Sequence, residues 1–235
     1  MWPIAGDVPA HRSYGKPARQ VQRRALLGGI FLLALSSWGG CTAAERPLKI
    51  VALGDSLTAG YQLPASQAFP AQLEAALRAK GVAVEIANAG VSGDTSSGGL
   101  ARLDWSVPAG TDAVILELGA NDMLRAVDPK VTQTALGTII RRLKERRIEV
   151  LLCGMLAVRN LGSDYARAFD GVYPALAAAN DVSFYPFFLD GIAGDSKLNQ
   201  NDGLHPTAAG VARIVQRILP KVEALVARVR ARPAS

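Results

Sequence analysis

The segment Ile50–Gly60, IVALGDSLTAG, joins an apolar, strand-like run to a glycine-rich turn that carries Ser56. Such runs are typical of strands in a parallel sheet that helices cover on both faces. A serine hydroxyl becomes an effective nucleophile when a base removes its proton and a third group orients the base. The segment DGLHP at 202–206 supplies both partners, because His205 lies three residues after Asp202. Together the two segments predict a nucleophile, a base and an orienting acid.

Each of these segments also has a purely structural interpretation. GDS is a common turn tripeptide, and an aspartate ahead of a helix can bond backbone amides without taking part in chemistry. The pairing favours catalysis because His205 is the only histidine after His11, so no other imidazole competes for the role of base. For the same reason we expect the activity to depend on pH through a single protonation step.

Short apolar runs and helical patterns alternate along the rest of the chain. The expected strands are Lys49–Leu53, Val82–Ala87, Ala113–Leu118, Val150–Met155 and Val182–Tyr185. The expected helices are Pro70–Lys80, Val131–Arg147, Ser163–Asn180 and Thr207–Arg230. This order predicts an α/β fold, a three-layer α/β/α sandwich around a mostly parallel sheet of about five strands. In such folds the functional site lies beyond the carboxyl ends of the strands, and Ser56 follows its strand on that side.

Two more segments follow the second and third expected strands. Asn88–Thr95 reads NAGVSGDT, and Val114–Asp122 reads VILELGAND. With the segments around Ser56 and His205, they resemble the four sequence blocks of the SGNH, or GDSL-type, hydrolases in order and spacing. The resemblance runs from about residue 48 to about residue 225. It is nearest to the bacterial periplasmic branch of arylesterases, acyl-thioesterases and lysophospholipases.

The resemblance implies a flavodoxin-like fold and a serine hydrolase that forms an acyl-enzyme. Ser56 would attack the acyl carbonyl, His205 would carry protons, and Asp202 would orient the imidazole. The backbone amides of Ser56 and Gly93 and the side-chain amide of Asn121 would form the oxyanion hole. Glycine at position 93 is expected to let the backbone approach the substrate closely.

The resemblance implies a small-molecule substrate, an ester or thioester of an acyl group. A carbohydrate O-deacetylase is the alternative on the same fold. Two apolar segments are expected to line the acyl pocket, and their candidate side chains are Met123, Leu124, Leu156 and Leu161. Ala120 departs from the glycine that is frequent in this branch, and adds a methyl group without removing a functional group.

Two other interpretations fit less of the chain. An α/β-hydrolase would carry GxSxG at its nucleophile, whereas position 58 is threonine. A non-catalytic anion- or nucleotide-binding module would use residues 54–60 to hold a phosphate. That module lacks the Lys–Ser/Thr pair of a P-loop and leaves the acid–histidine pair at 202–205 unexplained.

Composition argues against several partner classes. Of the formal net charge of +6, residues 1–41 carry five Lys or Arg and one Asp, which leaves 21 basic and 19 acidic side chains, a net charge of +2. No basic stripe interleaved with aromatic residues follows, so no nucleic-acid partner is expected. No cluster has metal-ligand spacing, and we expect neither a metal nor a cofactor. Cys153 lies in an apolar run and is expected in the core, not as a nucleophile.

Residues 1–44 are expected to form an export signal. A pair of arginines precedes the apolar run Ala25–Ser37, whose 13 residues suit a signal-peptide core and are few for a bilayer span. Cleavage before Cys41 would give a lipid-anchored protein, and an uncleaved membrane anchor is a further alternative. Cleavage near residue 44 would release a periplasmic or secreted protein. Trp38 favours this cleavage site, because it is an unusual residue ahead of a cysteine that becomes lipidated. Residues 45–235 would then form one hydrolase domain.

Overall fold

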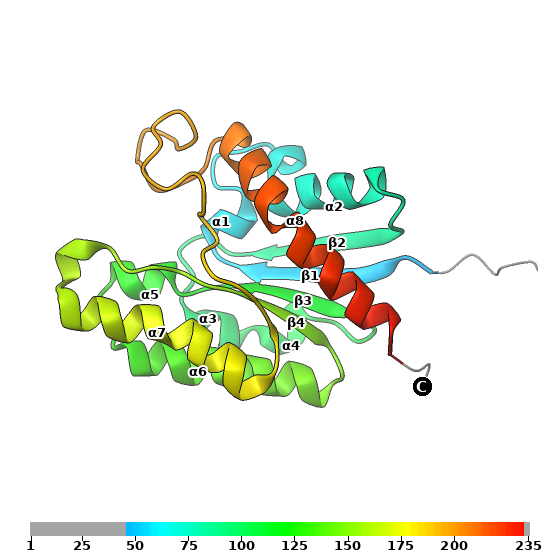
Figure 1. The fold of residues 1–235 in the computed structure, drawn as a ribbon, viewed down its shortest axis with the longest axis horizontal. Helices are drawn as coiled ribbons and strands as arrows, with labels where there is room; N and C mark the ends of the chain where they lie inside the picture. Colours follow the sequence, from blue (N-terminus) through cyan, green and yellow to red (C-terminus); the bar gives the residue numbers. More distant parts are fainter. Residues whose placement is uncertain (1–45, 233–235) are drawn as a thin grey trace, which may run out of the picture. The chain divides into compact units, whose positions relative to one another are not determined.

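The computed structural model describes residues 46–232, which contain one five-stranded sheet in the order β2-β1-β3-β4-β5. All neighbouring strands pair in parallel. Figure 1 shows the strands running toward the left of the view, so their carboxyl ends share one edge. The strands are β1 (Leu48–Gly54), β2 (Val84–Gly90), β3 (Ala113–Glu117), β4 (Glu149–Cys153) and β5 (Ser183–Tyr185).

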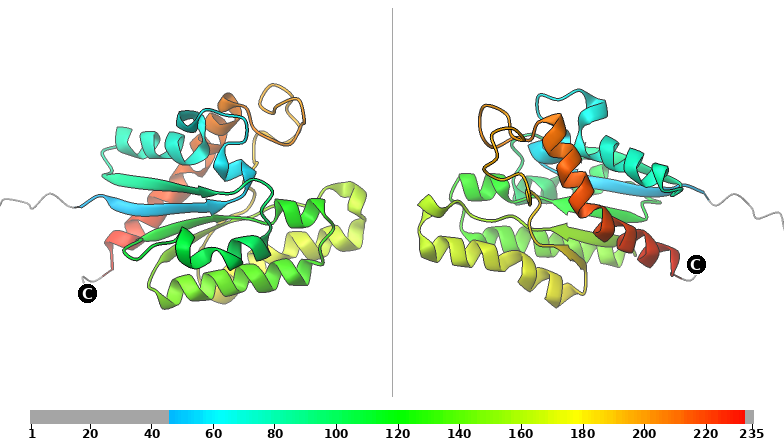
Figure 2. Two further views of the ribbon diagram at one scale, coloured as in Figure 1. Left: turned by 180° about the vertical axis from the view of Figure 1, so that it is seen from behind. Right: turned by 45° about the horizontal axis from the view of Figure 1, so that its top comes forward.

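Helices cover the sheet on both faces, which confirms the predicted three-layer sandwich. The long helices are α2 (Phe69–Ala79), α6 (Pro129–Glu145), α7 (Ser163–Asn180) and α8 (Ala208–Arg230). Helices α2 and α8 pack together on one face, and α6 packs with α7 on the other (Figures 1 and 2). α6 buries Thr132, Leu136, Ile139 and Leu143, the three- and four-residue spacing of one helical face.

The central strand β3 shows why the strands could be predicted from continuous apolar runs in the sequence. All five residues of β3 are buried, because β1 and β4 flank it and helices cover both of its faces. The edge strand β2 differs from the expectation: it begins two residues later than predicted and continues to Gly90 through the polar Asn88. It pairs with β1 alone, and polar side chains are tolerated there because much of β2 remains exposed.

Several short helices were not predicted. They are α1 (Ser56–Ala59), α3 (Ser96–Ala101), α4 (Leu103–Ser106), α5 (Ala120–Leu124) and the 3₁₀ turns η1 (Ala65–Gln67) and η2 (Arg159–Leu161). Elements of three to six residues are too short to display a helical period in the sequence. Three of them, α1, α3 and α5, begin within six residues of the end of a strand, and they shape the carboxyl edge of the sheet.

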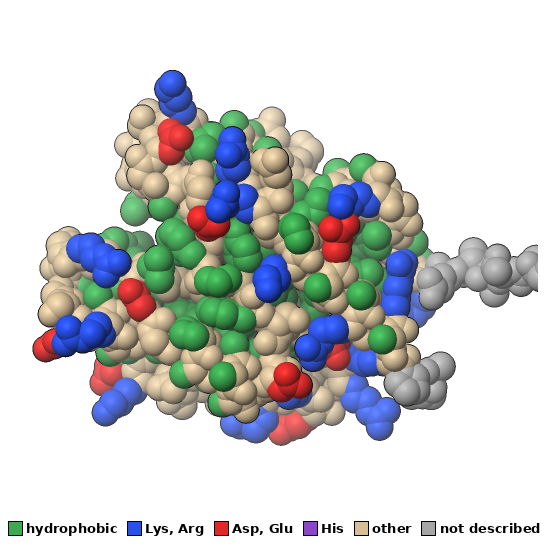
Figure 3. Space-filling view, viewed as in Figure 1, with side chains coloured by type: hydrophobic (Ala, Val, Ile, Leu, Met, Phe, Trp, Pro, Cys, Tyr) green, Lys and Arg blue, Asp and Glu red, His purple; other side chains and the backbone are tan. Residues whose placement is uncertain are grey.

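The surface along the β5 edge of the sheet, between α7 and α8, has an apolar strip. In Figure 3, hydrophobic side chains gather between these helices, and charged side chains lie mostly around them. Partly buried Val182, Phe184, Phe187 and Leu189 belong to β5 and its flanking segments. The edge strand itself has only three residues, so it offers few unpaired backbone groups to another chain. Among residues 46–232, no helix has both the length and the apolar character needed to cross a membrane.

Candidate active site

Ser56 lies where β1 turns into α1. Asp55 is the N-cap of this helix, and its Oδ1 accepts a hydrogen bond from the Leu57 amide at 3.0 Å. Ser56 is therefore the first helical residue, with its hydroxyl at the carboxyl edge of the sheet. The side chain that caps the helix belongs to Asp55, so the Ser56 hydroxyl is not needed as a cap.

The structure brings Ser56, His205 and Asp202 together. His205 Nε2 is 2.9 Å from Ser56 Oγ, and His205 Nδ1 is 2.7 Å from Asp202 Oδ2. The ring of Tyr61 lies against the imidazole, with 4.4 Å between ring centroids. The His205 side chain thus contacts Ser56, which lies 149 residues earlier in the sequence.

Asp202 is held in its ionised form. Its Oδ1 accepts hydrogen bonds from the backbone amides of Leu204 at 2.9 Å and His205 at 3.0 Å. These two bonds, followed by the bond to the His205 ring, lower the pKa of Asp202 to about 2. The acid is therefore a fixed negative charge beside the imidazole at neutral pH.

Asn121 lies in the first turn of α5, directly after β3. Its Nδ2 donates a hydrogen bond to Asp55 Oδ2 at 3.1 Å. Because an amide NH2 carries two hydrogens, this bond fixes the group and leaves the second hydrogen to point elsewhere. Asp55 thus connects the turn at Ser56 with the Asn121 side chain.

Gly93 lies in the loop between β2 and α3, with a φ of 82°. Arg125 Nη2 donates to its carbonyl oxygen at 2.8 Å. A Cβ at this position would meet only the end of the Arg125 side chain, at 3.7 Å. The left-handed backbone favours glycine here, and the close approach of substrate to this position stays a prediction.

A buried arginine holds the ends of β1 and β2, and no role was predicted for it from the sequence. Arg102 is 7% exposed and forms an ion pair with Asp94 at 2.6 Å. Its Nη2 donates to the carbonyl of Gly54 at 2.8 Å, and its Nη1 donates to that of Ala89 at 2.9 Å. The same guanidinium thus fixes the segments that lead to Ser56 and to Gly93.

A second buried contact positions α5. Asp122, 1% exposed, accepts hydrogen bonds from the Ser96 amide at 2.8 Å and the Ser96 hydroxyl at 2.5 Å. It also accepts from the Thr132 hydroxyl at 3.0 Å. These bonds tie the helix that carries Asn121 to α3 and α6.

The candidate acyl-pocket side chains separate into two groups. Leu124 is 48% exposed and Leu156 is 39% exposed, whereas Leu161 is half-buried. Met123 is 5% exposed and belongs to the core, so it does not line an open surface as we had expected. Four further large apolar side chains are exposed outside the strands and helices: Tyr61, Val91, Val158 and Leu204.

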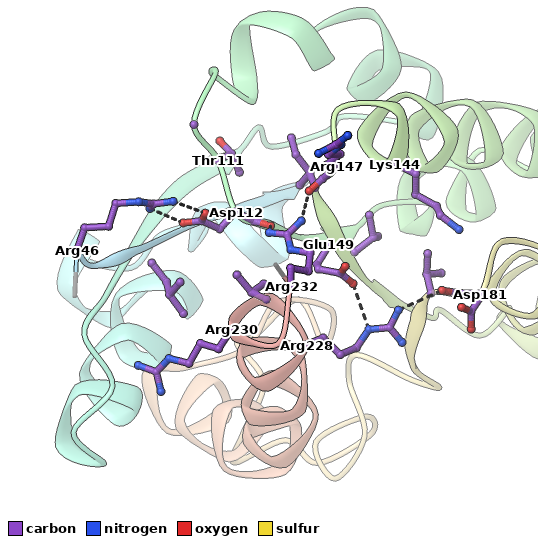
Figure 4. Close-up of a pocket in the computed structure, with 16 residues that line it drawn as sticks. Arg46, Thr111, Asp112, Lys144, Arg147, Glu149, Asp181, Arg228, Arg230 and Arg232 are labelled. Carbon is purple, nitrogen blue, oxygen red and sulfur yellow. Dashed lines mark hydrogen bonds and ion pairs between the residues drawn. The ribbon is translucent and has the colours of Figure 1, made fainter. Parts of the chain in front are cut away.

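A cavity of about 960 Å³ lies at the opposite edge of the sheet, near the amino ends of β1 and β4. Figure 4 shows Arg46 directed at Asp112 and Arg228 directed at Glu149 within it. None of the described residues that line this cavity is a serine, cysteine or histidine. Its size therefore does not make it a rival for the nucleophile and base at the carboxyl edge.

Residues 52–213 match the family described as GDSL-like lipase/acylhydrolase. The chain belongs to this family. It is accordingly an ester-cleaving serine hydrolase of the SGNH fold, as the resemblance of the four sequence segments had implied. Its substrates are small-molecule esters.

Curated relatives of this hydrolase include Esterase TesA of Pseudomonas aeruginosa, which is 37% identical over 205 residues, 87% of this chain and all of the relative. Thioesterase 1/protease 1/lysophospholipase L1 of Escherichia coli K12 is 36% identical over 178 residues, 75% of this chain and 84% of the relative. Among solved structures, the SGNH-hydrolase family esterase AlinE4 is 43% identical, with a TM-score of 0.65, covering 80% of this chain and 98% of that one.

Proposed function

We propose that this hydrolase cleaves acyl esters or thioesters through an acyl-enzyme on Ser56. The observation that carries the proposal is the 2.9 Å separation of His205 Nε2 and Ser56 Oγ. His205 takes the Ser56 proton as the oxygen attacks the acyl carbonyl, and then gives that proton to the leaving group. Asp202 holds the Nδ1–H tautomer and stabilises the imidazolium that forms. In the second half, His205 activates a water that releases the acid and regenerates Ser56.

The oxyanion of each tetrahedral intermediate requires donors that are in place before the charge develops. We assign this role to the backbone amides of Ser56 and Gly93 and to the Asn121 side chain. Two observations support this assignment: the three groups share a position at the carboxyl edge of the sheet, and hydrogen bonds hold them in place. Asn121 is fixed by Asp55, and the Gly93 carbonyl is fixed by Arg125.

An apolar acyl group is the substrate class that we favour. The exposed side chains of Leu124, at the end of α5, and of Leu156 and Val158, in the loop after β4, offer apolar surface in segments that follow the carboxyl ends of strands. The names arylesterase and lysophospholipase, which relatives carry, point the same way. An O-deacetylase, whose acyl group is a single acetyl, has no use for such a surface.

Hydrolysis of nitrophenyl esters from acetyl to palmitoyl, beside acyl-CoA and lysophospholipid, tests this proposal. Each methylene that becomes buried contributes about 0.8 kcal/mol, so kcat/KM should rise by up to about fourfold per methylene over the first additions. Leu156→Ala should lower the rate on medium chains and leave acetyl esters unchanged. Trp105→Ala, which removes a 73% exposed side chain on α4, is the control. An optimum at acetyl would favour the deacetylase instead.

The acid limb of the pH profile should combine the single protonation step expected from the sequence with a second step from Asp55, and should therefore be steeper than one step alone. Burial raises the pKa of Asp55 to about 6, against the bonds from Leu57 and Asn121. As the pH falls through this value, Asp55 loses the charge that holds Asn121. The slope of log kcat/KM against pH should therefore exceed one on the acid side. In Asp55→Asn the slope should return to one, and a slope of one in the parent enzyme would contradict this role for Asp55.

We further propose that residues 1–44 direct export and are removed; they lie outside the described residues. The support is the apolar run Ala25–Ser37 after paired arginines. Mass spectrometry of the exported protein should find a new N-terminus near residue 44. A diacylglyceryl group on Cys41 would instead show a lipid anchor, and an intact Met1 would contradict both routes.

A further inference from the structure

A buried acid beside the candidate site has no role in the mechanism above. Glu117 is the last residue of β3, is completely buried, and pairs with Gly54 of β1 and Cys153 of β4 in the sheet. Its Oε2 accepts a hydrogen bond from Thr58 Oγ1 at 2.8 Å. The backbone amide of Asp55 is also directed at Oε2, at 3.4 Å. Glu117 therefore contacts the α1 turn on both sides of Ser56.

The other oxygen of Glu117 distinguishes two protonation states. Among the described residues, Oε1 is buried and has no hydrogen-bond donor. An ionised carboxylate in that position would hold half of its charge on an unsatisfied oxygen, which is costly away from water. A neutral acid places a hydroxyl there instead, and a hydroxyl needs an acceptor. The Asp55 side chain acts on the Glu117 carboxyl through a hydrogen bond, so its carboxylate is the group that can accept this hydrogen.

The surrounding groups also favour the neutral acid. The titratable groups that act on Glu117 or are affected by it are Asp55, Cys153 and Tyr173, and none of them is a cation. Burial first, and then the Asp55 charge, raise the pKa of Glu117 well above its ordinary value. Asp55 itself is influenced by His205 and Asp94.

The buried guanidinium at this end of β1 is already engaged. Arg102 donates to the Gly54 carbonyl and pairs with Asp94, so it is not directed at Glu117. Of the two buried acids, Asp55 has donors for both oxygens, namely the Leu57 amide and Asn121. The proton shared by the pair therefore belongs on Glu117, and the charge belongs on Asp55.

We propose that Glu117 is a positioning residue that acts as a neutral acid, donating to Asp55 so that Asp55 holds Asn121 and the Ser56 turn together. The effect of Glu117 on catalysis rests on the proposed function. The ends of two strands, β1 and β3, are then connected by one chain of hydrogen bonds, from Thr58 through Glu117 and Asp55 to Asn121. Such support matters because a donor displaced by about 1 Å can cost about a hundredfold in rate.

Two substitutions at position 117 separate this role from simple filling of space. Glu117→Gln keeps the shape and a neutral donor, so kcat should stay within about threefold of the parent. Glu117→Leu leaves Thr58 and Asp55 without their partner, and kcat should fall about 10- to 100-fold with KM changed by less than about twofold. Glu149→Gln, at the start of β4 and paired with Arg228, is the matched control and should leave kcat unchanged. A Gln variant as impaired as the Leu variant would overturn the proposal.

Infrared spectroscopy tests the protonation state without relying on activity. In the parent enzyme and in Ser56→Ala at neutral pH, we expect the C=O band of a protonated carboxylic acid that shifts when glutamate is labelled with ¹³C. The band should be absent from Glu117→Gln. The parent spectrum alone decides the question if a variant fails to fold: the absence of any glutamate-linked band would overturn the proposal. A Ser56→Ala protein that kept both the band and full activity would contradict the proposed function and leave the Glu117 assignment standing.

Discussion

Ser56→Ala should abolish ester hydrolysis, with a loss of at least about a thousandfold in kcat/KM. The substitution removes the only hydroxyl within hydrogen-bonding distance of His205 Nε2 among the described residues. The fold should survive, because Asp55 and not Ser56 caps α1. Steady-state kinetics on a short nitrophenyl ester, with circular dichroism and thermal unfolding on the same samples, provide the measurement.

The control for this variant is Ser97→Ala, which changes an exposed serine on α3. It should match the parent in both activity and stability. If Ser56→Ala kept half of the parent activity while remaining folded, the nucleophile would be another group and the proposed mechanism would fail.

Asn121→Ala should lower kcat by about 10²–10³ and change KM little, because the donor acts on charge that develops in the transition state. The variant also removes the hydrogen bond to Asp55 Oδ2. Asp55→Asn separates the two effects, since it keeps Asn121 and alters only its partner. It should therefore cost less than the loss of Asn121 itself.

The split between kcat and KM decides the role of Asn121. Initial rates over a wide range of ester concentration, on both variants and the parent, provide it. A raised KM with an unchanged kcat would make Asn121 a residue for ground-state binding, and the oxyanion assignment would be wrong.

The architecture could be predicted because the burial of its strands leaves apolar runs in the sequence. β1 and β3 are apolar along almost their whole length, since neighbours flank them on both sides and helices cover both faces. The same topology gathers the ends of β1, β2 and β3 at one edge, so Ser56, Gly93 and Asn121 could be expected to meet. One histidine after residue 11 then left no second choice for the base.

The supporting contacts could not be predicted, because their meaning depends on burial. A sequence shows Arg102 as one of many arginines, and only the fold reveals that it joins two strand ends through backbone carbonyls. Glu117 likewise reads as a polar interruption of an apolar strand. The prediction for Met123 was wrong for the same reason. Its apolar side chain suited a pocket, but α5 places it in the core.

Covalent labelling with a fluorophosphonate is the most direct test of the central claim that Ser56 is the activated nucleophile. The reagent forms a stable bond only with a serine that a neighbouring base deprotonates. Intact-protein mass spectrometry should find one adduct per chain, peptide mapping should locate it on Ser56, and Ser56→Ala should remain unlabelled. An active enzyme that takes up no label, or that carries it on another residue, would contradict the account.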